Sequence, residues 1–336
     1  MPIVKTDDYT IKQAARLISE GELVAFPTET VYGLGGDAFN KNAITKIFDV
    51  KNRPLFDPLI VHIASLETLE QVADISSLDL KTKNNLYLLA EKLWPGPFTV
   101  ILPKQKSIPD LVTSGLPTVA MRFPSHPAAR ALIEFSGTAI AAPSANPFGY
   151  LSPTRAEHVL EMLGDKIQMI LDGGLPQVGL ESTVLDLCRE KPCILRPGGI
   201  TKETIEEIIG PVETAFASDG GINLLSPGML KSHYAPKTPL LLFEKIPATE
   251  NKTEKAACIF FDGHSRDRWL LEKPEYKTLL TTVLSETGNL QEAAANLFET
   301  LHKLDSIGLS AIYTQLAPEE GLGIAINDRL KRAGRL

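Results

Sequence analysis

Three short segments of the chain place hydroxyl, amide or cationic side chains next to apolar runs. The first segment follows an apolar run and reads PTETVYGLGG over residues 27–36. Hydroxyl groups and bare glycine backbone at the carboxyl end of a strand suit a small polar ligand. The spacing Gly33-x-Gly35-x-x-Ala38 matches the dinucleotide fingerprint, but six residues separate it from the strand, so we interpret the match as chance. A tight structural turn at these glycines is the alternative.

The second segment carries two cations. It reads KNRPLFDPL over residues 51–59 and lies between a predicted helix and a predicted strand. Pro54 favours an extended conformation for Arg53, which directs Lys51 and Arg53 to similar sides. Such a pair can grip a polyphosphate, because arginine offers a planar fork of donors and lysine a point charge. The alternative is a solvated connection, which the usual exposure of loops favours when this segment is taken alone.

The third segment, AAPSAN, ends a predicted strand and precedes a predicted helix. Ser144, Asn146 and Ser152 would bring donors close to the backbone N–H groups of the helix N-terminus, which is a natural anion cradle. Thr154 and Glu157 have the spacing of a capping box, which predicts that the helix begins beside this threonine. The alternative is that these polar groups only cap the helix and close a turn.

Other strand ends carry isolated cations and hydroxyls. Arg122 ends an apolar run, where it either binds a ligand carboxylate or forms a structural ion pair. Ser182 precedes a further run, and Arg196 ends another. The six histidines include no H-x-x-x-H pair, and Ser144 lacks the flanking glycines of a hydrolase elbow. These residues favour the binding and positioning of anions over covalent or zinc catalysis.

Short apolar runs alternate with amphipathic stretches over residues 11–196, which predicts an α/β domain around a large sheet. Strands are predicted at residues 23–26, 59–62, 98–102, 119–122, 139–142, 169–171, 184–187 and 194–196. Helices are predicted at residues 11–19, 43–50, 80–93, 128–135, 155–163 and 202–209.

Periodicity fails between residues 211 and 239, where serine, glycine and proline cluster, so a linker is predicted there. A second, smaller α/β domain follows. Its predicted strands are residues 240–243, 257–261 and 311–314, and its predicted helices are residues 290–304 and 324–332. The expected organisation is a first domain, a linker and a second domain over residues 1–212, 213–237 and 238–336.

The composition of the 336-residue chain restricts its partners. Lys and Arg number 34 and Asp and Glu number 41, which gives a net charge of −7 and argues against general affinity for nucleic acid or anionic membranes. Three cysteines cannot form a disulfide framework, so a reducing cytoplasm is expected. No apolar run approaches the roughly 20 residues of a membrane span, and no membrane association is expected.

Together and in this order, the segments resemble the threonylcarbamoyl-AMP synthases, which have a YrdC-type fold, in their longer two-domain form. The resemblance rests on PTETVYGL, on K-x-R-P at residues 51–54, on PSAN at residues 143–146 and on SPGM-x-x-x-HYAP at residues 226–236. Each segment alone is weak, but the four in this order are highly specific. The resemblance implies a twisted, open, YrdC-like α/β sheet domain joined by a long linker to a smaller Rossmann-like α/β domain.

The resemblance also implies an enzyme, a nucleotidyltransferase of tRNA modification. Members of the family form L-threonylcarbamoyladenylate and pyrophosphate from ATP, L-threonine and bicarbonate, and Mg²⁺ is the expected cofactor. A separate transferase complex is the partner that moves the threonylcarbamoyl group to the adenosine beside the anticodon of tRNAs that read codons starting with A. Direct binding of tRNA stays open. The alternatives are an RNA-binding module with this fold and a carbamoyl-transfer enzyme with another acceptor.

Individual residues receive roles from the same resemblance. Lys51 and Arg53 are the expected catalytic cations. The residues expected to line the ATP site are Lys51, Arg53, Asp57, Thr118, Ser144, Asn146, Ser152, Arg196 and Tyr234. The residues expected to line the L-threonine site are Thr30, His62, Arg122, Ala142 and Ser182. The linker with Tyr234 is expected to fold over the site and exclude water, because carbamates decompose in water.

Overall fold

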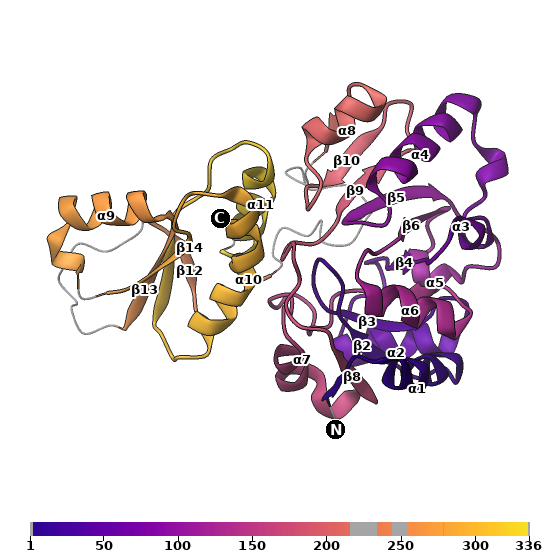
Figure 1. The fold of residues 1–336 in the computed structure, drawn as a ribbon, viewed down its shortest axis with the longest axis horizontal. Coiled ribbons are helices and arrows are strands. Elements are labelled where there is room, and N and C mark those ends of the chain that lie inside the picture. Colours follow the sequence, from indigo (N-terminus) through magenta and orange to yellow (C-terminus); the bar gives the residue numbers. More distant parts are fainter. Residues whose placement is uncertain (1–2, 216–233, 244–254, 278, 335–336) are drawn as a thin grey trace. The chain divides into compact units, whose positions relative to one another are not determined.

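The structure is a computed structural model, and it describes residues 3–215, 234–243, 255–277 and 279–334 (Figure 1). These residues form two compact units. Unit 2 contains the described residues from 234 onward together with the short segments Gly149–Leu151 and Val178–Leu180, and unit 1 contains the rest. In the described part of the chain, no helix is both long enough and apolar enough to cross a membrane.

Unit 1 is built on one mixed sheet, whose described strands lie in the order β1-β8-β2-β3-β7-β4-β6-β5-β9-β10-β11. The central strands β4 and β6 are parallel, and their outer neighbours β7 and β5 run antiparallel to them. The strands are β1 (Ile3–Lys5), β2 (Val24–Phe26), β3 (Gly33–Asp37), β4 (Ile60–His62), β5 (Phe98–Pro103), β6 (Thr118–Arg122), β7 (Ile140–Ala141), β8 (Met169–Asp172), β9 (Thr183–Asp186), β10 (Cys193–Arg196) and β11 (Glu213–Thr214).

Helices connect these strands, and the α/β class predicted from the sequence is confirmed. The described helices of unit 1 are α1 (Asp8–Ser19), α2 (Lys41–Lys51), α3 (Leu66–Val72), α4 (Leu80–Leu93), α5 (Asp110–Thr113), α6 (Pro127–Ser136), α7 (Ala156–Leu163) and α8 (Lys202–Ile209), with short 3-10 turns η1 (Ile75–Ser77) and η2 (Gly164–Lys166).

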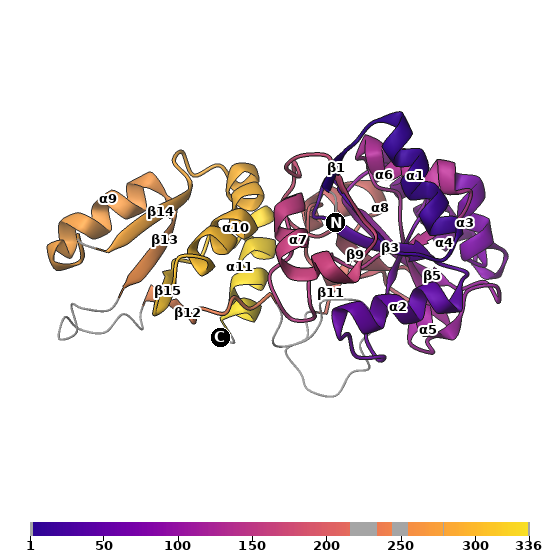
Figure 2. The ribbon, with the colours of Figure 1, turned by 90° about the horizontal axis from the view of Figure 1, so that it is seen from below.

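The sheet of unit 1 buries a different apolar layer on each face, because side chains alternate along a strand. Val61 and Met121 belong to a layer that also contains buried side chains of α2, α4 and α8. Phe26 and Ile140 belong to the other layer, which α1 and α6 cover. Figure 2 shows α1 and α6 on one side of the strands, with α2 and α5 on the other.

The glycine-rich segment predicted as a turn is in part a strand, β3, which pairs antiparallel with β2. Glycine has low strand propensity, so the pattern hid this strand. Packing explains the composition: a Cβ at Gly35 would lie 2.6 Å from the Phe26 ring and 2.7 Å from Cγ2 of Ile140. The rejection of the dinucleotide fingerprint therefore holds for a further reason, since its glycines lie within a strand.

The capping box predicted at Thr154 is wrong. The N-cap of α7 is Arg155, and its side chain makes no capping hydrogen bond. Thr154 instead donates its backbone N–H to Nδ1 of His158 at 3.3 Å. The predicted helix is confirmed, and only its capping differs, because the imidazole one turn along the helix takes the place of the expected glutamate.

Unit 2 contains a parallel four-stranded sheet in the order β12-β15-β13-β14. Figures 1 and 2 show α9 on one side of this sheet, with α10 and α11 on the other. The strands are β12 (Leu240–Leu242), β13 (Ala256–Asp262), β14 (Leu280–Ser285) and β15 (Ala311–Thr314). The helices are α9 (Gly263–Glu272), α10 (Leu290–Asp305) and α11 (Leu322–Ala333), with the 3-10 turn η4 (Pro274–Tyr276). The expectation of a smaller Rossmann-like α/β fold is confirmed.

Besides β3, six elements escaped the sequence pattern. The helices α3, α5 and α9 and the strands β1, β11 and β14 were not predicted, and β11 lies inside the predicted linker. Most are very short or only partly buried, so they carry little periodic signal.

Gly35→Ala tests the packing between β2, β3 and β7. The new methyl group would overlap Phe26 and Ile140, so we expect a loss of about 1–3 kcal/mol in the free energy of unfolding. Urea unfolding measures this loss. Gly33→Ala in the same strand is the matched control, because its Cβ would lie 3.4 Å from the nearest atom of Phe26, an ordinary contact. Equal losses in both variants would contradict the steric explanation.

Candidate functional site

Two predicted threonine-site residues lie side by side at the ends of the central strands. His62 ends β4 and Arg122 ends β6, and the two residues are register partners in this parallel pair. Alternation places them on the same sheet face as Ile60 and Ala120, which form a small apolar cluster. The His62 imidazole and the Phe26 ring form a T-shaped pair, with 6.2 Å between the ring centroids. The relative position of His62 and Arg122, both predicted to bind threonine, is therefore fixed by strand register.

The guanidinium of Arg122 is held by the PTET segment. Its Nη2 lies 2.6 Å from Oε1 of Glu29, and its Nη1 donates to Oγ1 of Thr30 at 2.9 Å. Oε2 of Glu29 accepts from the backbone N–H of Ser125 at 3.1 Å. Both charged residues are only 4% exposed. Burial is the largest single influence and would raise the pKa of Glu29, but attraction to Arg122 together with the hydrogen bonds from Arg122 and the backbone outweighs it, so the pKa is lowered and the carboxyl is ionised.

Sequence reasoning did not select Glu29 as a functional residue, although it lies in the motif that was recognised. The feature that could have identified Glu29 is a carboxylate between two hydroxyl residues, in a segment that is almost entirely buried in the structure. Its partner Arg122 lies 93 residues further along the chain, so only the assembled sheet reveals the pair.

His62 provides a neutral imidazole. Burial, followed by the nearby charge of Arg122, lowers its pKa to about 3. Its Nδ1 has no hydrogen-bond partner among the described residues. A buried polar atom without a partner is costly, and a ligand group can satisfy it.

The first of the residues predicted to bind the nucleotide is Lys51, the last residue of α2. Its ammonium group donates to the backbone carbonyls of Ser144, at 2.5 Å, and Asn146. This residue is 1% exposed, and burial followed by the charge of Arg53 lowers its pKa well below the usual value. Lys51 thus ties the end of α2 to the PSAN segment. The alternative of a solvated connection is wrong, because Arg53 is also buried, at 7% exposure.

Arg53 and Asp57 form a buried pair next to Lys51. Nε of Arg53 donates to the backbone carbonyl of Asp57 at 3.0 Å, and Nη2 lies 2.9 Å from Oδ2 of the same residue. Oδ1 of Asp57 has no hydrogen-bond partner among the described residues. Burial raises the pKa of Asp57, while Arg53, Lys51 and Arg196 oppose this shift. Three basic side chains, Arg53, Lys51 and Arg196, therefore face the Asp57 carboxyl, an arrangement that can attract an anionic ligand.

Arg196 connects the two ends of the site. A β-bulge interrupts β10 just before it, and such bulges re-aim side chains. Its Nε and Nη2 donate to the backbone carbonyl of Ser182 at 3.1 and 2.9 Å. The hydroxyl of Ser182 lies 2.7 Å from that of Thr99, which is the register partner of Arg122. A Cβ at Gly198 would lie 2.3 Å from the carbonyl of Glu181, so only glycine permits this close approach of the two segments.

The structure also describes the positions of three further residues of unit 1 that were predicted to line the site. Ser152 donates its hydroxyl to Oε1 of Glu181 at 2.5 Å, and Ala142 is buried just after β7. Thr118 begins β6, at the opposite end of that strand from Arg122. Because β4 and β6 are parallel, Thr118 lies at the same end of the sheet as Asp57, which precedes β4. Thr118 and Arg122 therefore lie at opposite ends of β6, whereas Arg196 lies in the same cross-strand row as Arg122, through Thr99 and Val184.

Tyr234 lies in unit 2. Its backbone is left-handed, with φ of 64°, and its ring is 1% exposed. The ring centroid is 5.6 Å from that of Phe298, and the guanidinium of Arg329 lies 5.2 Å from it. The part of the linker motif over residues 226–233 lies outside the described residues. The nucleotide and covering roles of Tyr234 stay predictions.

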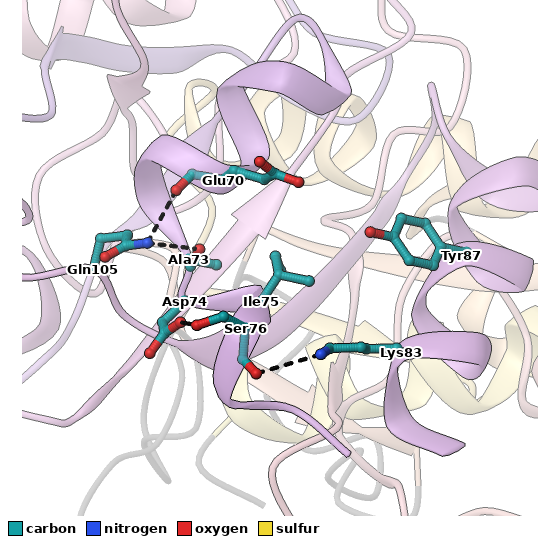
Figure 3. A pocket seen from close by; sticks show the side chains of 8 residues that line it. All are labelled: Glu70, Ala73, Asp74, Ile75, Ser76, Lys83, Tyr87 and Gln105. Atoms are coloured by element: carbon teal, nitrogen blue, oxygen red, sulfur yellow. Dashed lines mark hydrogen bonds between the residues drawn. The ribbon is translucent and has the colours of Figure 1, made fainter. Parts of the chain in front are cut away.

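A separate surface pocket lies beside η1. Figure 3 shows its polar lining, in which Lys83 donates to the backbone carbonyl of Ser76 at 3.3 Å. The volume is about 380 Å³, and the lining residues are Glu70, Ala73, Asp74, Ile75, Ser76, Lys83, Tyr87 and Gln105. None of the predicted site residues lines this pocket, and its polar groups largely bond to one another.

No resident metal site is evident in the described parts of the chain. They contain no group of three or more His, Cys, Asp or Glu residues that could hold an ion. Among the residues predicted to bind the nucleotide, Asp57 is paired with Arg53 and faces further basic side chains, and Ser152 donates to the carboxylate of Glu181. This donor set does not fit a protein-held Mg²⁺, which prefers carboxylate and other oxygen ligands.

The fold and site define an α/β protein with a YrdC-like domain and a smaller C-terminal domain. A family model described as "Telomere recombination" (Sua5, YciO, YrdC) matches residues 16–198. A second, the threonylcarbamoyl-AMP synthase C-terminal domain, matches residues 200–334. The chain belongs to the threonylcarbamoyl-AMP synthase family.

Similar proteins extend over nearly the whole chain. A threonylcarbamoyl-AMP synthase of Pyrococcus abyssi is 40% identical, over 98% of this chain and 95% of its own. One of Bacillus subtilis is 42% identical, over 98% and 94%. The crystal structure of P. abyssi Sua5 complexed with L-threonine matches with a TM-score of 0.89 and 38% identity, over 99% of this chain and 98% of that one.

The low pKa of His62 predicts how acid affects stability. In the unfolded chain histidine titrates near pH 6.5, whereas folded His62 stays neutral to about pH 3. The unfolded state takes up the proton first. The contribution of neutral His62 to stability is therefore present above about pH 6.5 and is lost as the pH falls toward 3.

We expect the stability advantage of wild type over His62→Asn to shrink by about 2 kcal/mol between pH 7 and pH 5. Urea unfolding at both pH values measures this difference. His264→Asn, at an exposed histidine of α9, is the control and should show no comparable trend. A stability difference for His62→Asn that does not change with pH would contradict the buried neutral state.

Proposed function

We propose that this protein synthesises L-threonylcarbamoyladenylate and pyrophosphate from ATP, L-threonine and bicarbonate. The observation that carries the proposal is that Ser182 lies between residues predicted for ATP and residues predicted for L-threonine. Ser182 contacts Arg196 on one side and Thr99, the register partner of Arg122, on the other. One end carries basic side chains that can bind a polyphosphate. At the other end, the buried guanidinium of Arg122 lies beside the neutral imidazole of His62. The P. abyssi relative that binds L-threonine supports this reading.

The residue roles follow from this arrangement. We assign ATP to Lys51, Arg53, Asp57, Thr118, Ser144, Asn146, Ser152, Arg196 and Tyr234. We assign L-threonine to Thr30, His62, Arg122, Ala142 and Ser182. Arg122 holds the carboxylate of threonine, and the small side chain of Ala142 leaves room for the substrate. Nδ1 of His62 is available to a donor of the amino acid.

The reaction has two bond-forming steps. The threonine amine loses a proton, and its nitrogen forms a bond with the carbon of bicarbonate-derived CO₂, which gives a carbamate. A carbamate oxygen then attacks the α-phosphorus of ATP, the bond from this phosphorus to the bridging oxygen of the β-phosphate breaks, and pyrophosphate leaves. Such transfers depend chiefly on alignment and on cations that offset phosphate charge. Lys51 and Arg53 supply these cations.

The substrates and the next acceptor complete the proposal. Mg²⁺ would enter with ATP, bound to phosphate oxygens, because the described residues offer no fitting ligand set. The adenylate would pass to a separate transferase complex that modifies tRNA. We place the reaction in the cytoplasm, which the three free cysteines support. The catalytic part, linker and C-terminal part are assigned to residues 1–212, 213–237 and 238–336.

Mass spectrometry tests the function directly. The purified chain is incubated with ATP, Mg²⁺, L-threonine and ¹³C-bicarbonate, and we expect labelled threonylcarbamoyladenylate together with pyrophosphate. Omission of threonine or of bicarbonate should abolish both products. Turnover of ATP that does not need threonine would favour a carbamoyl-transfer enzyme with another acceptor. Salt-sensitive RNA binding without turnover would favour an RNA-binding module.

Lys51→Ala and Arg53→Ala should each lower the rate of pyrophosphate release by about 100-fold or more, because charge on the phosphates is no longer offset. Lys46→Ala is the control, since this half-exposed lysine of α2 pairs with Glu22. Thermal unfolding shows whether each variant is folded. Full turnover in a folded variant of either residue would remove it from the mechanism.

A further inference from the structure

We propose that Glu29 makes the amino-acid end of the site select a zwitterion over a simple anion. It acts through Arg122, as a positioning and specificity residue. This inference rests on the proposed function, since it concerns how the same site distinguishes its substrates. Glu29 is not among the residues assigned to ATP or threonine above.

The charge of the amino-acid end is balanced before any ligand binds. The carboxylate of Glu29 lies 2.6 Å from the guanidinium of Arg122, and both side chains are about 5% exposed. The neighbouring His62 is neutral, because its pKa is about 3. The pair therefore has no net charge, whereas the Asp57 carboxyl at the nucleotide end faces three basic side chains, Arg53, Lys51 and Arg196. A buried guanidinium without a partner would attract any small anion.

Arg122 keeps donors for a ligand in spite of this pairing. Its Nε donates to the carbonyl of Gly96 at 3.4 Å, and each terminal nitrogen uses one N–H, toward Thr30 and Glu29. Among the described residues, the second N–H of each terminal nitrogen has no hydrogen-bond partner. Two such donors match the number that one carboxylate accepts in a bidentate pair. Arg122 can thus bind a carboxylate while Glu29 offsets its charge.

The position of Glu29 is fixed from both sides. Oγ1 of Thr28 donates to the carbonyl of Val31 at 2.6 Å and accepts the N–H of Thr30 at 3.2 Å, which closes a turn around Glu29. The N–H of Ser125 holds the second carboxylate oxygen. The pair is therefore preorganised rather than formed on binding.

This balance has a consequence for a reaction mixture rich in anions. ATP, bicarbonate and the product pyrophosphate are all anionic, and each would compete for an unbalanced guanidinium. A zwitterionic amino acid carries no net charge, so it can bind beside the Glu29–Arg122 pair, which has no net charge either. Glu29 thereby reserves Arg122 for the amino acid and leaves the phosphates to Lys51, Arg53 and Arg196.

Inhibition by inorganic sulfate tests the proposal. In the wild-type enzyme, sulfate should compete with ATP and not with L-threonine. In Glu29→Gln, which keeps an oxygen acceptor but removes the negative charge, sulfate should compete with L-threonine as well. When sulfate is added to Glu29→Gln, the KM for L-threonine should rise by about tenfold or more, because the charged hydrogen bond between this residue and Arg122 is altered. The KM for ATP should change little.

Glu206→Gln is the matched control. Glu206 also accepts a backbone N–H, from Val212, and lies near a cation, Lys202, but it belongs to α8. This variant should keep the wild-type inhibition pattern. If sulfate competes with L-threonine in the wild-type enzyme, that measurement alone overturns the proposal. An unchanged pattern in folded, active Glu29→Gln would also overturn it. If instead wild type forms no threonylcarbamoyladenylate, the proposed function itself fails.

Discussion

Buried charge must be compensated inside the protein, and this constraint organises the whole site. Arg122, Arg53 and Lys51 are all nearly inaccessible to water, and an uncompensated charge there would be very costly. Each is compensated in a different way. Arg122 has the Glu29 carboxylate, Arg53 has Asp57 together with backbone carbonyls, and Lys51 donates to two backbone carbonyls and is attracted by Asp57. Compensation thus grades from direct ion pairs at Arg122 and Arg53 to mainly backbone carbonyls at Lys51.

This gradient depends on the assembled sheet, because most partners come from distant segments. Glu29 follows β2, whereas Arg122 ends β6, and the two are brought together only when β3, β7 and β4 lie between these strands in the correct register. A shift of one residue in β6 would turn Arg122 toward the apolar layer on the other face. Strand register is thus a condition for charge balance, and the tight packing of Gly35 against Phe26 and Ile140 helps to maintain it.

The same dependence explains what could be predicted from the sequence. Lys51, Arg53 and Ser144 were recognised because their motifs are local, and most strands and helices were found from their periodicity. Loop composition alone favoured a solvated Lys51, because the carbonyls that accept from it lie 93 and 95 residues away. The strand β3 was hidden by glycines, and Glu29 was missed because its partner is remote. Contacts between residues far apart in the sequence determine these features, so a short stretch of sequence cannot reveal them.

The parallel sheet of unit 2 also has its charges compensated within the protein, but there the protein's own carboxylates occupy the anion position. In doubly wound parallel sheets, anions bind where helices begin at the carboxyl ends of strands. Here α9 begins directly after β13, but the chain supplies its own anions at this position. Asp262 caps the helix by accepting from Ser265 at 2.7 Å, and Glu286 lies so close that a Cβ on Gly263 would be 2.4 Å from its carboxylate. Arg266 pairs with Glu286 at 2.9 Å. The anion position at α9 is therefore filled by the protein itself, whereas the basic side chains around Lys51 can attract an anionic substrate.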